Sequence, residues 1–183
     1  MTSILGLSGS LRRKSFNTGV LYAASDLVPA GVTIDARTIH GVPLYDADLE
    51  AEGTPETVRA LREALSAADG LLMVTPEYNN SLPGVFKNAI DWIGSGEGAK
   101  LFAGKPVALI GASPGGFGTI LSQNAWLPVL RTLGARPWFE GRLMISKASG
   151  LFDEDGRLVD EKTRQRLAEF VAGFAQSISA YDG

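Results

Sequence analysis

The sequence predicts a three-layer α/β fold in which helices cover both faces of a five-stranded parallel sheet. First, apolar segments of strand length alternate with amphipathic segments of helix length along the 183 residues. Second, segments 71–74 and 106–111 are continuous apolar runs, as expected of strands buried on both faces. Third, short right-handed crossovers leave few topologies, and a doubly wound sheet is the most direct one. We take the strand order 2-1-3-4-5 by analogy with a common doubly wound sheet.

The expected elements alternate from the first residues to the last helix. Strands are expected at 3–7, 33–39, 71–74 and 106–111, with a fifth inside 136–146. Helices are expected at 18–28, at 54–68, from Gly84 onward, at 119–133 and at 161–178. Polar and apolar residues alternate along 33–39, which indicates a partly exposed strand at the edge of the sheet.

Several connections carry local signals. Residues 41–53 are expected to form a surface loop, 95–104 a mobile Gly-rich segment and 152–157 a polar turn. Thr54 offers a capping hydroxyl at the start of the second helix, and Gly134 ends the fourth. The core-facing residues predicted for the helix after Gly84 are Val85, Ala89, Trp92 and Ile93.

Composition limits the classes of function, and we expect one domain over residues 1–183. The net charge of -3 argues against a general binder of nucleic acids or anionic membranes. We expect no membrane-spanning segment and no signal peptide, and therefore a cytoplasmic location. The chain has no cysteine and a single histidine, His40, which argues against thiol chemistry and a structural metal site. Redox chemistry would therefore need a bound cofactor.

The loop after the first strand, 9–18, predicts a phosphate site. Three consecutive cations, 12–14, precede a helix N-terminus, where the helix dipole favours an anion instead. Hydroxyl and amide donors are added by Ser10, Ser15, Asn17 and Thr18. The alternative is a solvated basic turn in which Asn17 only caps the helix. A dinucleotide fingerprint and a nucleotide-triphosphate loop are both absent from this segment.

Two further loops follow buried strands, at the strand ends where open α/β sheets bind ligands. Residues 76–84, PEYNNSLPG, offer an aromatic ring, two amides and a carboxylate, which suit a planar polar ring. An ordinary Pro- and Asn-rich turn explains this loop equally well. Residues 113–118, SPGGFG, would let a ligand approach the backbone and would stabilise negative charge on a reduced flavin ring. The alternative is that these glycines only satisfy a tight turn.

Together, the three loops resemble the NADPH-dependent FMN reductase family, which includes bacterial chromate and quinone reductases and relatives of azoreductases. The motifs are GSLRRKSFN, PEYNNSLPGVFKNAIDW and SPGGFGT, and they span about the first two thirds of the chain. The last third, including the segment 125–128, matches the family pattern poorly. The resemblance implies a flavodoxin-like fold that binds FMN.

The resemblance also implies roles for individual residues. Residues that would hold the FMN phosphate are Ser10, Arg12, Ser15, Asn17 and Thr18. Residues that would line the isoalloxazine and ribityl groups are Pro76, Glu77, Tyr78 and Asn79, and the ring's polar edge would contact Ser113, Gly115 and Gly116. Members of the family are commonly dimers or tetramers, so we expect a homodimer or homotetramer.

The implied reaction passes hydride from NADPH or NADH to FMN, and then electrons to a small-molecule acceptor such as a quinone, chromate, an azo compound or free flavin. No catalytic side chain is required for the first half, and the sequence offers no credible triad, metal cluster or carboxylate pair. Tyr78 is a candidate for the acceptor site, whereas His40 is expected at the surface. The rival hypotheses are a non-catalytic FMN electron carrier and a flavin-binding sensor or partner protein.

Overall fold

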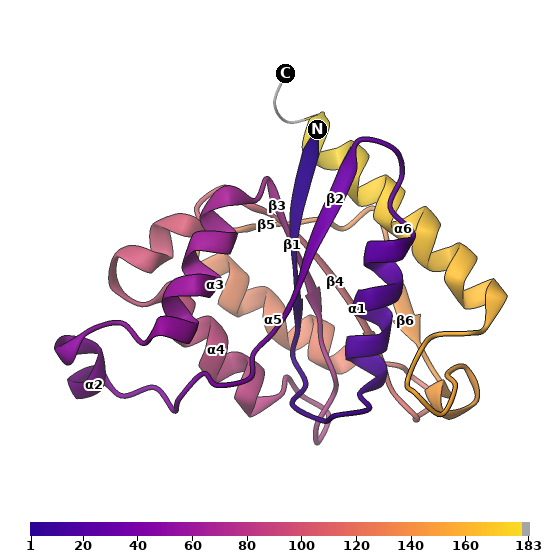
Figure 1. Ribbon diagram of the computed structural model, residues 1–183, viewed down its shortest axis with the longest axis horizontal. Coiled ribbons are helices and arrows are strands. Elements are labelled where there is room, and N and C mark those ends of the chain that lie inside the picture. Colours follow the sequence, from indigo (N-terminus) through magenta and orange to yellow (C-terminus); the bar gives the residue numbers. More distant parts are fainter. Residues whose placement is uncertain (181–183) are drawn as a thin grey trace.

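The structure is a computed structural model that describes residues 1–180, and its sheet lies between two layers of helices (Figure 1). The strands are β1 (Thr2–Ser8), β2 (Val32–Thr38), β3 (Gly70–Val74), β4 (Pro106–Ala112), β5 (Arg136–Pro137) and β6 (Leu143–Ile145). The α-helices are α1 (Phe16–Asp26), α2 (Ala47–Glu52), α3 (Glu56–Ala67), α4 (Gly84–Gly94), α5 (Ile120–Thr132) and α6 (Glu161–Ser179). Two short 3-10 helices are η1 (Gly96–Leu101) and η2 (Ala148–Gly150).

The sheet has the predicted order, β2-β1-β3-β4-β5, and each pair of neighbouring strands is parallel. The strand β2 lies at an edge, as its alternating pattern predicted. Ser8 pairs with Val74, and Val74 pairs with Ile110, so β1, β3 and β4 end at nearly the same level. The loops that follow these three strands therefore leave the sheet side by side.

The fifth strand is interrupted. Both β5 and β6 pair with β4 on the side opposite β3, but five residues, 138–142, separate them. On β4, only Ala108 and Leu109 lie between the paired segments, so the extra residues bulge out of the sheet. This bulge explains why the sequence allowed no sharp prediction of a strand inside 136–146.

Helices cover each face of the sheet (Figure 1), and each face has its own apolar core. On one face, α1 and α6 pack over side chains such as Ile4, Leu72 and Ile110. On the other face, α3, α4 and α5 enclose a cluster whose largest members include the fully buried Phe86 and Trp126. Alternate residues of each central strand point into opposite cores, which is why these strands are apolar without interruption.

Several local predictions were wrong. The segment 41–53 is not a plain loop, because it contains α2, which Asp46 caps by accepting a hydrogen bond from Asp48 N–H. Pro55, not Thr54, is the N-cap of α3, and the Thr54 hydroxyl accepts from Arg62 instead. The helix α1 begins and ends two residues earlier than predicted, and 95–104 contains η1. In α4, Val85 is exposed.

The buried stripe of α4 contains three of the four predicted residues, Ala89, Trp92 and Ile93, but not Val85. Phe86, Ala89, Ile90 and Ile93 recur at helical spacing and are buried together with Trp92. Val85 lies just outside this stripe. Its apolar character alone gave no indication of which neighbour, Val85 or Phe86, faces the core.

Candidate functional site

The three predicted loops meet at the carboxyl edge of β1, β3 and β4, where they enclose a cavity of about 210 Å³. The cavity is lined by Ser10, Arg12, Ser15, Phe16, Asn17, Pro76, Glu77, Tyr78, Ala112, Ser113 and Pro114. The predicted site residues brought together here are Ser10, Arg12, Ser15, Asn17, Pro76, Glu77, Tyr78 and Ser113. Those that lie near it without lining it are Thr18, Asn79, Gly115 and Gly116.

One end of the cavity is a set of hydrogen-bond donors. Ser15 is the N-cap of α1, and the buried Ser10 lines the same cavity. Within residues 1–180, the main-chain N–H groups of Phe16 and Asn17 donate no hydrogen bond. The first turn of α1 also contains no acidic residue. Free N–H groups, hydroxyls and the positive end of the helix dipole together form a site for an anion such as a phosphate.

The three cations of this loop point in different directions. Arg12 lines the cavity, and its guanidinium carbon lies 5.5 Å from the centre of the Phe16 ring. Lys14 turns away, because its ammonium group donates to the Glu154 carbonyl at 2.6 Å. Arg13 lines two cavities on the outer side of α1. Only Arg12 among the three is therefore placed to pair with an anion in the cavity.

Two of the predicted phosphate ligands already have protein partners. The buried Asn17 amide donates to the Ala112 carbonyl and accepts from the Ala112 N–H, both at 2.9 Å. The Thr18 hydroxyl lies 2.8 Å from the Ser8 hydroxyl. Asn17 thus ties α1 to the end of β4, and Thr18 ties it to the end of β1. Nothing in the sequence distinguished these side chains from their neighbours that face the cavity.

The second loop is held by a tight turn and by a capping carboxylate. Tyr78 and Ser81 exchange main-chain hydrogen bonds, and Asn79 and Asn80 have φ values of 50° and 62°. Two successive positive φ values define a type I′ turn, which favours asparagine. Glu77 Oε2 accepts from the N–H groups of Leu121 and Ser122 at 2.9 and 3.1 Å. This carboxylate caps α5, whose own N-cap residue makes no side-chain capping bond.

The third loop presents an open glycine to solvent. A Cβ atom at Gly116 would meet no other atom within 4 Å, and its φ is not in the left-handed region. Neither the backbone nor the packing of the protein therefore requires glycine at this position. A ligand lying against the backbone would require it, and the donor set at the other end of the cavity matches a phosphate. The residues present therefore fit FMN.

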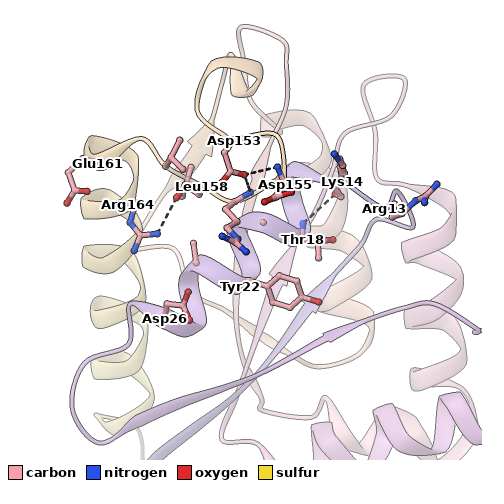
Figure 2. Close-up of a pocket in the computed structure, with 16 residues that line it drawn as sticks. Arg13, Lys14, Thr18, Tyr22, Asp26, Asp153, Asp155, Leu158, Glu161 and Arg164 are labelled. Carbon is pink, nitrogen blue, oxygen red and sulfur yellow. Dashed lines mark hydrogen bonds between the residues drawn. The ribbon is translucent and has the colours of Figure 1, made fainter.

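A larger cavity of about 630 Å³ lies on the outer side of α1, under the turn that precedes α6 (Figure 2). It includes Ser15 and Thr18 from the predicted site, and its other charged residues are of both signs. Its lining does not include the residues that follow β3 and β4, so it is a poor match to a cofactor gripped by three loops.

Other site types receive no support from the described residues. Within residues 1–180, no group of three or more His, Asp or Glu side chains is arranged to hold a metal ion. His40 is exposed and lies within 3.1 Å of the Thr38 hydroxyl and of the Leu11 carbonyl. No helix in the same range is both long and apolar enough to cross a membrane.

Comparison with known proteins agrees with this geometry. The family model described as NADPH-dependent FMN reductase matches residues 2–150. An NAD(P)H-dependent FMN reductase of Pseudomonas aeruginosa is 46% identical over 166 residues, which cover 91% of this chain and 89% of that protein. A 2-hydroxy-1,4-benzoquinone reductase of Burkholderia sp. is 40% identical over 167 residues, which cover 91% of each chain.

A solved structure is similar over nearly the whole length. It is FerB, a flavoenzyme NAD(P)H:(acceptor) oxidoreductase from Paracoccus denitrificans, with a TM-score of 0.86, 33% identity and 98% of each chain covered. The similarity thus extends beyond the first two thirds of the chain, to which the three sequence motifs were confined. This chain belongs to the NADPH-dependent FMN reductase family and has its flavodoxin-like fold.

Proposed function

We propose that this chain transfers hydride from NAD(P)H to an FMN held between its three loops, and then reduces a quinone. Family membership supports the oxidoreductase activity with FMN and NAD(P)H. The observation that carries the placement of the cofactor is the convergence of the three loops on one cavity with an anion site at one end. The names of several relatives, which are quinone reductases, support the choice of acceptor.

At the phosphate end, we assign direct contacts to Ser10, Arg12 and Ser15, together with the free N–H groups of Phe16 and Asn17. Arg12 supplies the positive charge, since the Lys14 ammonium group is bound to Glu154. The side chains of Asn17 and Thr18 act differently from our first expectation. They hold the loop by bonding to Ala112 and Ser8, so their contribution to FMN binding is to keep the donors in place.

At the ring end, Pro76, Glu77 and Tyr78 form one wall and Ser113 belongs to the other, with Gly115 and Gly116 next to it in the same loop and assigned to the ring's polar edge. Asn79 maintains the turn that presents Tyr78, and Glu77 fixes this wall to α5. Tyr78 is 47% exposed, so its ring is free to meet the nicotinamide or the acceptor. When bound, FMN supplies the hydride-accepting ring, and the chain binds it, orients it and leaves an approach for both substrates.

Three further features belong to the same proposal. The chain forms a homodimer or homotetramer. This is supported by a cavity of about 330 Å³ between α4 and α5, whose lining includes the apolar residues Ile90, Val129 and Leu133. The chain is a single domain over 1–183. Its location is the cytoplasm.

An absorption spectrum of the purified protein, followed by anaerobic addition of NADPH and then NADH, tests the proposal. We expect an oxidised-flavin spectrum that bleaches with either nucleotide and recovers when a quinone is added. Chromate, an azo compound and free flavin are tested as competing acceptors in the same assay. Bound FMN without NAD(P)H turnover would instead favour the electron carrier or the sensor, and failure to bind FMN after reconstitution would contradict the cofactor assignment.

A further inference from the structure

A short hairpin near the C-terminus, residues 152–158, lies beyond the part of the chain that matches the family model. We call it the C-terminal turn. Phe152 and Leu158 form an antiparallel bridge at its base. Asp153 Oδ1 accepts from the N–H groups of Asp155 and Arg157 at 3.0 and 2.8 Å, and Asp153 N–H donates to the Arg157 carbonyl. The turn is thus held in one conformation by its own hydrogen bonds.

The C-terminal turn lies on α1, as Figure 2 shows. The Lys14 ammonium group donates to the Glu154 carbonyl at 2.6 Å. Gly19 lets the turn approach closely, since a Cβ atom at Gly19 would be 2.2 Å from the Gly156 carbonyl oxygen. The rings of Phe152 and Phe16 pack with their centres 4.9 Å apart. Three contacts therefore fix the turn against the start of α1.

Phe16 connects this packing to the anion site. The centre of its ring lies 4.9 Å from the centre of the Phe152 ring and 5.5 Å from the Arg12 guanidinium carbon. Within the described chain, the Arg12 side chain makes no hydrogen bond or ion pair, so the Phe16 ring is the group that orients its guanidinium. The position of the Phe16 ring therefore determines where the charge of Arg12 lies.

We propose that the C-terminal turn positions Arg12 for the FMN phosphate: Phe152 holds the Phe16 ring, and the ring holds the guanidinium. Phe152 is a positioning residue, because it does not line the cofactor cavity. This inference rests on the proposed FMN site. It assigns a function to residues outside the three motifs of the family.

The test compares the binding of FMN with that of riboflavin, which lacks the phosphate group. Apo-protein is titrated with FMN and with riboflavin, and dissociation constants are measured from flavin fluorescence. We expect Phe152→Ala to weaken FMN binding roughly three- to tenfold, the range expected for loss of one aromatic pair, and to leave riboflavin binding unchanged. Phe152→Tyr, which keeps the ring, should bind FMN as the unmodified chain does. Phe139→Ala is the matched control, since Phe139 is 67% exposed and lies in the bulge of the fifth strand.

A second comparison separates positioning from general damage. In an Arg12→Ala background, Phe152→Ala should have no further effect on FMN affinity. Equal loss of FMN and riboflavin binding, or additive losses in the double variant, would overturn the proposal. Phe152→Leu keeps apolar bulk against α1 and repeats the test if thermal unfolding shows that the alanine variant does not fold. An unmodified chain that binds no FMN would contradict the proposed function itself, whereas normal FMN affinity in both Phe152→Ala and Phe152→Leu contradicts only the role of the turn.

Discussion

Replacing Asn17 by alanine tests whether this residue belongs to the scaffold or to the ligand site. Its side-chain amide makes two buried 2.9 Å hydrogen bonds to the main chain of Ala112, at the end of β4. The substitution removes both bonds and leaves the N–H and C=O of Ala112 without their partner. If Asn17 instead served mainly as a phosphate ligand, the apo-protein would tolerate its loss.

The expected cost follows from these two groups. A net contribution of about 1 kcal/mol for each hydrogen bond, plus the cost of leaving two main-chain groups poorly solvated, gives a loss of about 2–4 kcal/mol. Ala112 borders the cofactor cavity, so water there should replace part of the lost bonding and keep the loss within this range. For a chain of this size, the melting temperature should fall by roughly 5–12 °C.

Thermal and urea unfolding of the apo-protein measure this loss. Asn124→Ala is the control, because Asn124 is an exposed asparagine in α5 whose side chain makes no hydrogen bond within the described chain. Asn17→Asp refines the test: a carboxylate cannot donate to the Ala112 carbonyl, but its protonated form can. The deficit of this variant should therefore shrink as the pH is lowered. An Asn17→Ala apo-protein as stable as Asn124→Ala would refute the scaffold role.

Four further predictions test the rest of the site. Arg12→Ala should weaken FMN binding roughly tenfold or more, as expected for loss of a charge-assisted contact, and leave apo-protein unfolding unchanged; equal FMN affinity by titration would remove Arg12 from the phosphate site. Glu77→Ala should lower apo-protein stability by about 1–2 kcal/mol in urea unfolding, because α5 loses its capping carboxylate, whereas a wild-type midpoint would show that the cap is dispensable. Gly116→Ala should weaken FMN binding but shift stability by no more than about 0.5 kcal/mol, since a Cβ there meets no other atom of the described chain within 4 Å, and a large stability loss would contradict the open space at this position. The Ser95 hydroxyl donates a hydrogen bond to Glu50 and lowers the pKa of that carboxyl, so the stabilising effect of the ionised carboxylate is present above about pH 4.5 and is lost as the pH falls through the lower folded-state pKa. Glu50→Gln should therefore lose less stability than the unmodified chain as the pH is lowered below about 4.5.

The central strands and the location of the site could be predicted because both depend on patterns that local residues carry, whereas the strand order came from analogy with a common doubly wound sheet. Unbroken apolar runs identified β3 and β4. The loops that follow the buried strands were identified as a ligand site from their hydrogen-bond donors and glycines. The helix end at Gly134 was also correct, and its φ of +70° explains the need for glycine. In each case the signal and its cause lie within a few residues of one another.

The predictions that failed depend on partners distant in the sequence. Thr54 was expected to cap α3, but Arg62 binds its hydroxyl while also binding the carbonyls of Trp92 and Ile93 at the end of α4. The pairing of Asn17 with Ala112 joins residues 95 positions apart, and Glu77 caps a helix that begins 43 positions later. A capping residue is recognised from its neighbours only when the cap is local, so no pattern in the sequence could reveal these contacts.

The cofactor motifs contain two kinds of residue, and their distinction predicts the state of the apo-protein. Asn17, Thr18 and Glu77 bond to the strands and to α5, so they keep the loops in place whether or not a ligand is bound. Within residues 1–180, Arg12, Gly116 and the N–H groups at the start of α1 have no comparable protein partner and remain available to FMN. Because the first kind is satisfied by the protein alone, the site should be largely formed before FMN binds, and little of the binding energy should be spent on ordering loops. Variants of the first kind should therefore lower apo-protein stability, and variants of the second kind should weaken FMN binding without destabilising the fold.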